Sequence, residues 1–577
     1  MKKIMNLAEN FVMEMCQGIV AAHPELELNE KYKVISRTQK KQNKVALISG
    51  GGSGHEPAHA GFVGTGMLDA AICGDVFASP SQIQVYQGIR QVANDAGVLM
   101  IIKNYSGDMM NFKNGAALAT EDGVNVEYVK VADDIAVEDS LYTVGRRGVA
   151  GTIFVHKIAG AAAEAGKSLT EVKAIAQKAA DNVRSIGFAF TSCTVPAKGT
   201  PTFELGEDEM EYGVGIHGEP GIRREKMMPS KDLAERMVDD LLKDLGDVQE
   251  VCVLVNGFGA TPLQELYVNH RDACVALQKR GIQVHRAFVG NYMTSIDMAG
   301  ASLTLLKVDD ELKQYVNAEA NTPALKVTGE AMPMRPIVEE TVTTETEPTF
   351  TVETNAQFAQ IQDEQFTLQN LHYTIDKMSA VIIENEVPFC ELDAHAGDGD
   401  FGMSVAKGFK QLKREWPELL KATTMSEFLL NSALIIMEHC GGASGPIWGS
   451  AFRSAGKAIA GKETLSQEQF ASMLQAAVTG IQKTGERSFG RGAVVGDKTL
   501  IDALVPAADA WSQNKGATFV ESFKAGAEAA VVGAESTKQI VARMGRAGTV
   551  GERSIGYPDA GAYGLGVIFT ELAKDIR

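Results

Sequence analysis

The pattern of the chain changes at residues 332–358, and this change limits the possible folds more than any other feature. The segment contains Pro333, Pro336 and Pro348 and a run rich in glutamate and threonine. Because it has little helical periodicity and enough charge to stay solvated, we predict that it is an interdomain linker. A chain of 577 residues is too long for one core, so separate domains are expected on either side.

The residues before the linker predict an α/β fold. Short apolar runs that are typical of buried strands alternate there with helical patterns. These runs are Val45–Ile48, Val98–Ile102, Val251–Val255 and Val284–Val289. We expect residues 1–331 to form two α/β lobes that divide near residues 185–194.

The residues after the linker predict an all-helical domain. Strand-like runs nearly vanish, and alanine-rich amphipathic segments replace them. These segments are Glu427–Glu438, Gln467–Gln482, Gly516–Ala530 and Val567–Ile576. Residues 359–577 should therefore pack helix against helix.

Composition argues against several classes of function. The net charge of −18, without a compensating basic run, argues against a nucleic-acid partner. No uncharged apolar run has the length needed to span a bilayer, and the N-terminus lacks the apolar core of a signal peptide. The seven cysteines are scattered without a CxxC pair, as expected for free thiols in a reducing compartment. We therefore expect a cytoplasmic protein that binds no membrane.

Three carboxylates, those of Asp393, Asp398 and Asp400, surround two glycines early in the helical half. On a continuous helix Asp398 would point away from the other two. A helix break near Gly397 and Gly399 would let all three converge. Converging carboxylates repel one another unless a cation lies among them, and hard oxygen ligands suit Mg²⁺ that is completed by substrate phosphates.

The same segment has two other interpretations. A surface loop of aspartate and glycine would have this sequence without binding a metal. An EF-hand beginning at Asp398 is excluded, because its ligand positions five and twelve would be Gly402 and Phe409.

In the α/β half, a predicted strand runs into the glycine-rich turn Gly50-Gly-Gly-Ser-Gly-His-Glu-Pro57. Such turns present backbone N–H groups to oxygen-rich ligands at the carboxyl end of a strand. The turn has neither the lysine of a P-loop nor the glycine spacing of a dinucleotide-binding fingerprint. His55 at its tip is a candidate functional residue, although a lone histidine is often structural.

A second predicted strand ends in Lys103 and is followed by Asp108, which should emerge at the same sheet edge as His55. An aspartate beside a substrate hydroxyl can act as general base in phosphoryl transfer. A surface salt bridge between Lys103 and Asp108 is the alternative.

A third segment, residues 212–221, places His217 among four glycines. An imidazole can act as a nucleophile toward a carbonyl carbon. A tight β-hairpin with an incidental histidine explains the spacing at least as well.

Together these segments resemble the single-chain, ATP-dependent dihydroxyacetone kinases over nearly the whole chain. The shared motifs occur in family order, and eight in register are highly specific. They are residues 50–57, 101–108, 145–148, 215–221, 393–400, 441–446, 496–499 and 551–556. The resemblance implies that the two α/β lobes bind the substrate and that the helical half is a nucleotide-binding barrel of antiparallel helices.

The resemblance also assigns roles in the α/β half. His217 is similar to the histidine that forms a hemiaminal with the ketone carbon, which would exclude glycerol because glycerol has no carbonyl. Asp108 is similar to the base for the attacking hydroxyl, and His55 to its hydrogen-bonding or acid–base partner. The turn residues Gly52, Ser53 and Gly54, with Lys103, would hold the substrate oxygens.

In the helical half the resemblance makes Asp393, Asp398 and Asp400 the ligands of the Mg²⁺ that tethers the ATP phosphates. It also implies a set of nucleotide contacts. These are Phe401, Gly402, Met403, Ser404, Gly442, Ala443, Ser444, Leu500, Arg546, Asp559, Ala560 and Gly561.

The sequence departs from the family at two places near the adenine side. Residues 491–493 read Arg-Gly-Ala where the family usually has Gly-Lys-Ala. Residues 556–562 read Gly-Tyr-Pro-Asp-Ala-Gly-Ala where the family has a histidine and a later proline. Individual nucleotide contacts are affected, while the reacting residues are unchanged.

On coil statistics a linker of about 25 residues spans roughly 25–30 Å, enough to serve its own chain or a partner chain. The resemblance favours a homodimer whose domains cross between subunits. It also leaves three alternatives open: a kinase for a related ketose such as erythrulose, an additional FAD-cleaving activity that forms cyclic FMN, and a non-catalytic ketose sensor.

Overall fold

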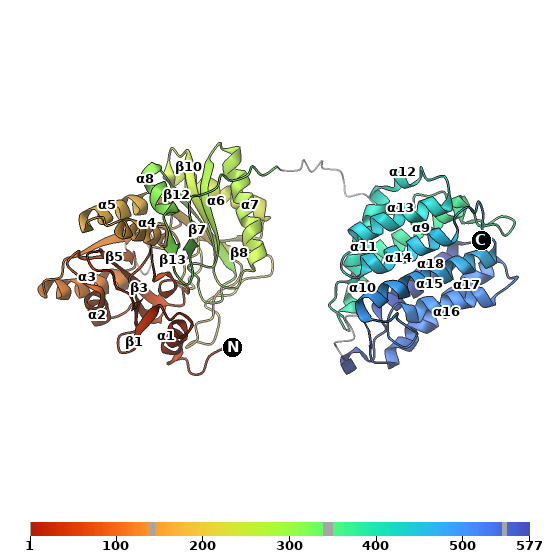
Figure 1. Cartoon of the computed structure of the whole chain (residues 1–577), viewed down its shortest axis with the longest axis horizontal. Helices are drawn as coiled ribbons and strands as arrows, with labels where there is room; N and C mark the ends of the chain where they lie inside the picture. The colour runs from red at the N-terminus through yellow and green to blue at the C-terminus, as the bar shows by residue number, and fades with distance from the viewer. Residues whose placement is uncertain (1, 139–144, 339–349, 396, 545–550) are drawn as a thin grey trace. The chain divides into compact units, whose positions relative to one another are not determined.

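The computed structural model describes residues 2–138, 145–338, 350–395, 397–544 and 551–577. The chain separates into two compact units, Met1–Thr341 and Val342–Arg577 (Figure 1). The first unit is α/β and the second is helical, as the sequence predicts. Among the described residues no helix is long and apolar enough to cross a bilayer, and all seven cysteines are free thiols.

The first sheet of the α/β unit carries the predicted glycine-rich turn. Its strand order is β1 (Leu26–Asn29), β2 (Val34–Arg37), β4 (Ala70–Val76), β3 (Ala46–Ser53), β5 (Val98–Lys103) and β6 (Val126–Val131). β4, β3, β5 and β6 run parallel, and β1 and β2 are antiparallel at one edge. β3 and β5 contain two of the predicted apolar runs, and a strand buried on both faces should read in that way.

The second sheet is mixed. Its order is β11 (Gln283–Gly290), β10 (Glu250–Gly257), β12 (Gly300–Lys307), β7 (Val183–Ala189), β8 (Glu209–Tyr212) and β9 (Arg223–Lys226). Only β10 and β11 pair in parallel among these strands. β8 and β9 form a hairpin, and the ten residues that connect them, 213–222, include His217.

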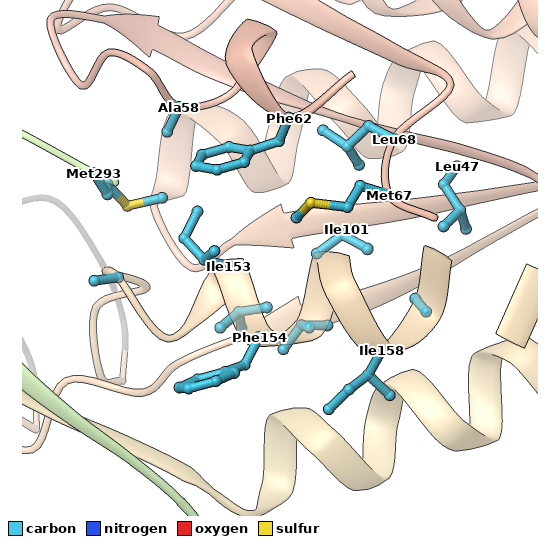
Figure 2. Close-up of a cluster of buried hydrophobic side chains, with 14 of the residues drawn as sticks. Leu47, Ala58, Phe62, Met67, Leu68, Ile101, Ile153, Phe154, Ile158 and Met293 are labelled. Carbon is cyan, nitrogen blue, oxygen red and sulfur yellow. The ribbon is translucent and has the colours of Figure 1, made fainter. Parts of the chain in front are cut away.

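Three hydrophobic layers hold the α/β unit together. The outer face of the first sheet packs on α2 (Gln82–Val92) and α3 (Ser106–Glu121), and that of the second sheet on α6 (Ser230–Leu245) and α7 (Leu263–Lys279). The middle layer contains α4 (Thr152–Glu164) and α5 (Leu169–Asp181). Figure 2 shows Ile101 of β5 beside Ile153 and Phe154 of α4, so segments distant in sequence share this core.

The helices of the second unit close into a ring. In chain order they are α9 (Leu368–Glu384), α10 (Glu386–Asp393), α11 (Phe401–Arg414), α12 (Trp416–Leu419), α13 (Met425–His439), α14 (Ser444–Ala458), α15 (Gln467–Phe489), α16 (Ile501–Gln513), α17 (Phe519–Ser536) and α18 (Ala560–Asp575). From α13 to α18 each packs on the next, α11 packs on α9 and α13, and α18 packs on α9. The predicted barrel of helices is confirmed.

Both described ends of the predicted linker contact the unit beside them. Ile337 exchanges two backbone hydrogen bonds with the Gln278 side chain of α7, at 3.2 and 3.3 Å. At the other end the buried Asp376 carboxylate accepts backbone N–H bonds from Glu353 (2.9 Å) and Thr354 (2.8 Å) and pairs with buried Lys413 (2.5 Å). Residues near both limits of the predicted 332–358 segment are therefore anchored.

We predict that Asp376→Ala destabilises the helical unit by about 3–5 kcal/mol, because it leaves the Lys413 ammonium buried without its carboxylate. Denaturant unfolding followed by circular dichroism measures the effect. The matched control is Glu418→Ala, which removes the partner of Lys421 in a pair whose side chains are 70% and 69% exposed, and this should change stability by less than about 1 kcal/mol. Equal effects of the two substitutions would contradict the prediction.

Candidate functional site

The candidate substrate site lies at the carboxyl ends of β3 and β5. These strands are parallel neighbours, so the residues that follow them meet at one sheet edge. His55 follows β3, Lys103 ends β5, and Asp108 lies in the first turn of α3. The Lys103 Nζ lies 3.8 Å from Asp108 Oδ2, and the two side chains are 0% and 5% exposed. This ion pair is buried, so the surface salt bridge is excluded.

Burial shifts the pKa of both partners toward their neutral forms. It raises the pKa of Asp108, although Lys103 and Ser79 favour the charged carboxylate. It lowers the pKa of Lys103, although Asp108 favours the charged ammonium. The pair is thus held together by mutual attraction in a site from which water is excluded.

The two candidate histidines are in direct contact. His55 Nδ1 lies 2.9 Å from the Thr294 carbonyl oxygen, and His55 Nε2 lies 3.2 Å from His217 Nε2. Since a carbonyl can only accept, Nδ1 of His55 carries the proton. Burial, with the charge of Lys103, lowers the pKa of His55 to about 3, so its Nε2 is unprotonated. His217 must then donate through Nε2, which leaves its Nδ1 with a free lone pair.

Aromatic side chains enclose the histidine pair. The Tyr105 ring lies 4.5 Å from the His217 ring, and the Phe77 ring lies 5.3 Å from both imidazoles. Three buried polar atoms in this cluster have no hydrogen-bond partner among the described residues. They are Lys103 Nζ, Tyr105 Oη and His217 Nδ1. Buried polar groups are rarely left unpaired, so this cluster suits a small ligand rich in oxygen.

The loop that carries His217 is held from below by Arg147 of the 145–148 motif. The Arg147 guanidinium contacts Asp134 (2.7 Å), Glu219 (3.0 Å) and the Gly213 carbonyl (3.0 Å). Glu219 in turn accepts the His217 backbone N–H at 2.9 Å. A side chain at Gly215 would lie 1.9 Å from Glu219, which explains this glycine.

The glycine-rich turn has little space for any side chain. A Cβ at Gly51 would lie 2.9 Å from Lys103 Nζ and 3.3 Å from Asp108 Oδ2. At Gly52 and Gly54 it would meet Phe77. The Ser53 hydroxyl donates to the Gly74 carbonyl at 2.7 Å, and this hydrogen bond links the turn to β4. Sequence reasoning named Gly52, Ser53 and Gly54 and did not name Gly51.

In the helical unit the three predicted metal ligands converge. One oxygen from each of Asp393, Asp398 and Asp400 lies within 4.8 Å of the others. The helix breaks between α10 and α11, with Gly399 at φ +77°, as the spacing predicts. Asp393 Oδ2 accepts the backbone N–H groups of Gly399 (2.9 Å) and Asp400 (3.1 Å), which folds the loop. The hard oxygen set fits a divalent cation such as Mg²⁺.

These carboxylates line a pocket that is formed by helix N-termini and that we call the phosphate-side pocket. The starts of α11, α14, α16 and α18 all line it. Helix N-termini present unpaired N–H groups and a positive dipole end, which favour phosphate groups. The predicted contacts that line it are Phe401, Ser404, Gly442, Ala443, Ser444, Leu500, Asp559, Ala560 and Gly561.

Two other predicted nucleotide contacts, Gly402 and Met403, lie outside the pocket. Gly402 packs on α10, where a Cβ would lie 2.0 Å from the Glu386 carbonyl oxygen. Met403 is 56% exposed, and its N–H donates to Cys390 Sγ at 3.2 Å. Neither is among the residues that line the pocket. Arg546 lies outside the described residues.

Sequence reasoning missed several residues at both sites. Phe77 and Tyr105 gave no signal beyond ordinary aromatic residues, although Tyr105 lies inside the 101–108 motif. Arg147 and Lys498 lie inside motifs that had no assigned role. Lys498, Thr499 and Met544 line the phosphate-side pocket.

Both halves of the chain match known protein families. The Dak1 domain family matches residues 17–324, and the DAK2 domain family matches residues 395–574. An L-erythrulose 1-kinase of Mycolicibacterium smegmatis is 34% identical over 100% of both chains. A triokinase/FMN cyclase of Rattus norvegicus is 35% identical over 100% of this chain and 99% of its own. A crystal structure of the C. freundii dihydroxyacetone kinase with AMP-PNP and Mg²⁺ has a TM-score of 0.61 and 31% identity, covering 99% of each chain.

An α/β unit with a buried imidazole cluster, joined to a helical unit with a carboxylate-lined pocket, defines a kinase of the fused two-domain class. The chain belongs to the dihydroxyacetone kinase family.

A second pair of histidines lies in the core of the α/β unit. His59 Nδ1 is 2.9 Å from His156 Nε2, and both side chains are buried. Burial, followed by the charge of Lys103, lowers the pKa of His156 to about 3 and holds that of His59 well below its usual value. Both imidazoles are therefore neutral in the folded protein.

We predict that His156→Gln reduces the loss of stability on acidification. His156 stays neutral in the folded state and takes up a proton near pH 6.5 when unfolded, so its contribution is present above pH 6.5 and is lost as the pH falls toward 3. Between pH 7.5 and 5.5 the wild type should lose about 1.4 kcal/mol more than the variant. Urea unfolding at both pH values measures this, with exposed Gln177→Ala of α5 as the uncharged control. Identical pH dependence in wild type and His156→Gln would contradict it.

Proposed function

We propose that the protein transfers the γ-phosphate of ATP to a terminal hydroxyl of dihydroxyacetone, with Mg²⁺ as cofactor. The observation that supports this most is the His55–His217 contact with its fixed tautomers, beside a buried Lys103–Asp108 pair. Phosphorylation of a ketose requires a nucleophile for the carbonyl carbon and a group that carries its proton, which His217 and His55 would supply. It also requires a base for the hydroxyl and a cation for the substrate oxygens, which Asp108 and Lys103 would supply.

The first step binds the ketose covalently. His55 Nε2 accepts the proton of His217 Nε2 as the electron pair released on His217 Nε2 attacks the carbonyl carbon, and the π pair of the C=O bond moves to oxygen. His55 Nε2, which lies 3.2 Å from His217 Nε2, then passes this proton to the new alkoxide oxygen. The product is a neutral hemiaminal. Because His55 has a pKa of about 3, it holds this proton only in passing.

The second step is phosphoryl transfer. Asp108 takes the proton of a terminal hydroxyl, the hydroxyl oxygen attacks the γ-phosphorus, and the bond from phosphorus to the ADP oxygen breaks. The raised pKa of Asp108 makes it a stronger base than an exposed carboxylate. The Lys103 ammonium, which has three protons and no hydrogen-bond partner among the described residues, is placed to donate to the ketose oxygens.

The helical unit would hold the nucleotide. Asp393, Asp398 and Asp400 would ligate Mg²⁺, which offsets charge on the β- and γ-phosphates when bound. Gly442, Ala443 and Ser444 at the start of α14 would donate backbone N–H groups to the phosphates. Asp559, which caps α18 through the Ala562 N–H at 2.8 Å, would fix the opposite wall.

A second acceptor and an additional activity are also candidates. Relatives with comparable identity over the whole chain are named L-erythrulose 1-kinase and triokinase/FMN cyclase. Erythrulose, which also has a ketone for His217 to attack, is therefore the second candidate acceptor. Conversion of FAD to cyclic FMN by the helical unit is the candidate additional activity.

We also propose the division of the chain into a substrate domain (1–331), a linker (332–358) and a nucleotide domain (359–577). A homodimer with domains crossing between subunits is proposed on the family resemblance alone.

We predict that His217→Ala abolishes selective turnover of ketoses. An ADP-release assay should show dihydroxyacetone as the preferred acceptor of the wild type, over glyceraldehyde, erythrulose and glycerol. The variant should lose about 10²–10⁴-fold in kcat/KM for dihydroxyacetone, since the covalent anchor and its proton transfer are lost together. ¹³C NMR with dihydroxyacetone labelled at C2 should show an sp³ carbon on the wild type only.

His23→Ala, which removes a partly exposed imidazole, is the matched control and should behave as the wild type. Unchanged turnover in a folded His217→Ala protein would overturn the assigned role. Faster turnover of erythrulose would replace the proposed acceptor, and cyclic FMN formed from FAD would establish the additional activity.

A further prediction concerns Asp398→Asn. Wild-type affinity for AMP-PNP in calorimetry should rise with added Mg²⁺, and the variant should lose about tenfold or more of that gain, because one anionic ligand is removed. Exposed Asp509→Asn of α16 should retain the full Mg²⁺ response. A full response in Asp398→Asn would exclude this carboxylate from the metal site.

A further inference from the structure

Lys498 occupies an unusual place beside the phosphate-side pocket. It lies in the 496–499 motif, between α15 and α16, with a left-handed backbone at φ +61°. Lys498 is 1% exposed. Burial lowers the pKa of Lys498, while the charges of Asp559 and Asp502 favour its charged form.

The Lys498 ammonium is surrounded by backbone carbonyls. Nζ lies 2.8 Å from the oxygen of Thr537, 3.3 Å from that of Ile540, 2.5 Å from that of Ser554 and 2.8 Å from that of Tyr557. An ammonium has three protons, so four carbonyl oxygens fully solvate it. No side-chain carboxylate takes part in these bonds.

The four carbonyls come from two stretches of chain, 537–543 and 551–557. These stretches also contact each other, through the Gly556 N–H to the Lys538 carbonyl (2.8 Å) and the Ala542 N–H to Ser554 Oγ (3.1 Å). The second stretch leads directly to Asp559, whose N–H donates to Thr537 Oγ1 at 2.8 Å. Lys498 therefore joins both stretches at the point where α18 begins.

We infer that Lys498 is a positioning residue for the nucleotide, acting as an internal cation that holds the 537–543 and 551–557 stretches and the start of α18 against the pocket. A left-handed non-glycine backbone is strained, and such strain persists where the surrounding structure requires the position. A ring of carbonyl oxygens of this kind can also bind a free monovalent cation. Here the Lys498 ammonium, which is attached to the chain, takes the place of such an ion. This inference rests on the proposal that the pocket holds ATP.

Lys498 would then affect the binding of the nucleotide and not that of the ketose. Its four bonds are all to backbone of the helical unit, so its loss should weaken nucleotide binding and leave the ketose site unaffected. Each hydrogen bond to a charged group contributes enough that losing the set should reduce nucleotide affinity about tenfold to hundredfold.

The test measures AMP-PNP binding by calorimetry, and the KM for ATP and for dihydroxyacetone, in the full chain. Lys498→Met keeps the length of the side chain and removes its charge. We expect its AMP-PNP Kd and its KM for ATP to rise about tenfold to hundredfold, with the KM for dihydroxyacetone unchanged. Lys498→Ala should show the same loss and should be rescued by n-propylammonium, which replaces the deleted atoms, and not by sodium chloride of equal ionic strength.

Wild-type affinity in Lys498→Met would overturn the inference. So would the failure of n-propylammonium to rescue a Lys498→Ala protein that unfolds at the wild-type temperature. If Lys498→Ala does not fold, Lys498→Arg decides, because a planar guanidinium cannot fill a cage shaped around one ammonium; unchanged affinity in that variant would overturn the inference. Absence of AMP-PNP binding in the wild type would instead refute the proposed function.

Discussion

The chemistry of the α/β unit depends on one carbonyl oxygen, that of Thr294. It accepts a hydrogen bond from Nδ1 of His55 and thereby fixes which nitrogen of each imidazole carries the proton. The loop that supplies this carbonyl is bound to the glycine-rich turn, since the N–H groups of Thr294 and Ile296 donate to the carbonyls of His55 and Gly54. These backbone hydrogen bonds join the loop to the glycine-rich turn and so place the Thr294 carbonyl to accept from His55, the proposed proton carrier for His217.

The surroundings of this cluster keep its charges few and balanced. Lys103 and Asp108 form one buried pair, and the nearby imidazoles are neutral, so no uncompensated charge is added to a site that excludes water. Arg147 forms a second group beside the His217 loop, in which one guanidinium pairs with the carboxylates of Asp134 and Glu219. The low polarity strengthens any hydrogen bond that a bound ketose would make to Lys103.

The helical unit meets the opposite problem, because it must bind an anion in a chain whose net charge is −18. Among the described residues, the starts of four helices and one basic side chain, that of Lys498, line its pocket. Helix N-termini supply positive potential without adding a net charge, and a divalent ion would compensate the three aspartates. Lys498 fits this arrangement, because its ammonium donates its hydrogen bonds to backbone carbonyls and not to a phosphate.

The sequence was sufficient for the parts of this molecule that follow from local rules. Buried strands reveal themselves as apolar runs, and a break at Gly397 and Gly399 is required if three carboxylates are to converge, so β3, β5 and the Asp393 loop could be predicted. The residues it missed act through contacts made only in three dimensions. Tyr105 encloses His217 from a position 112 residues away in the chain, and Lys498 is bound by carbonyls, which any residue can supply. Every residue has a backbone carbonyl, so the sequence does not indicate which carbonyls accept hydrogen bonds from side chains. The Thr294 oxygen that fixes the histidine tautomers and the oxygens that surround Lys498 can therefore be identified only from the folded backbone.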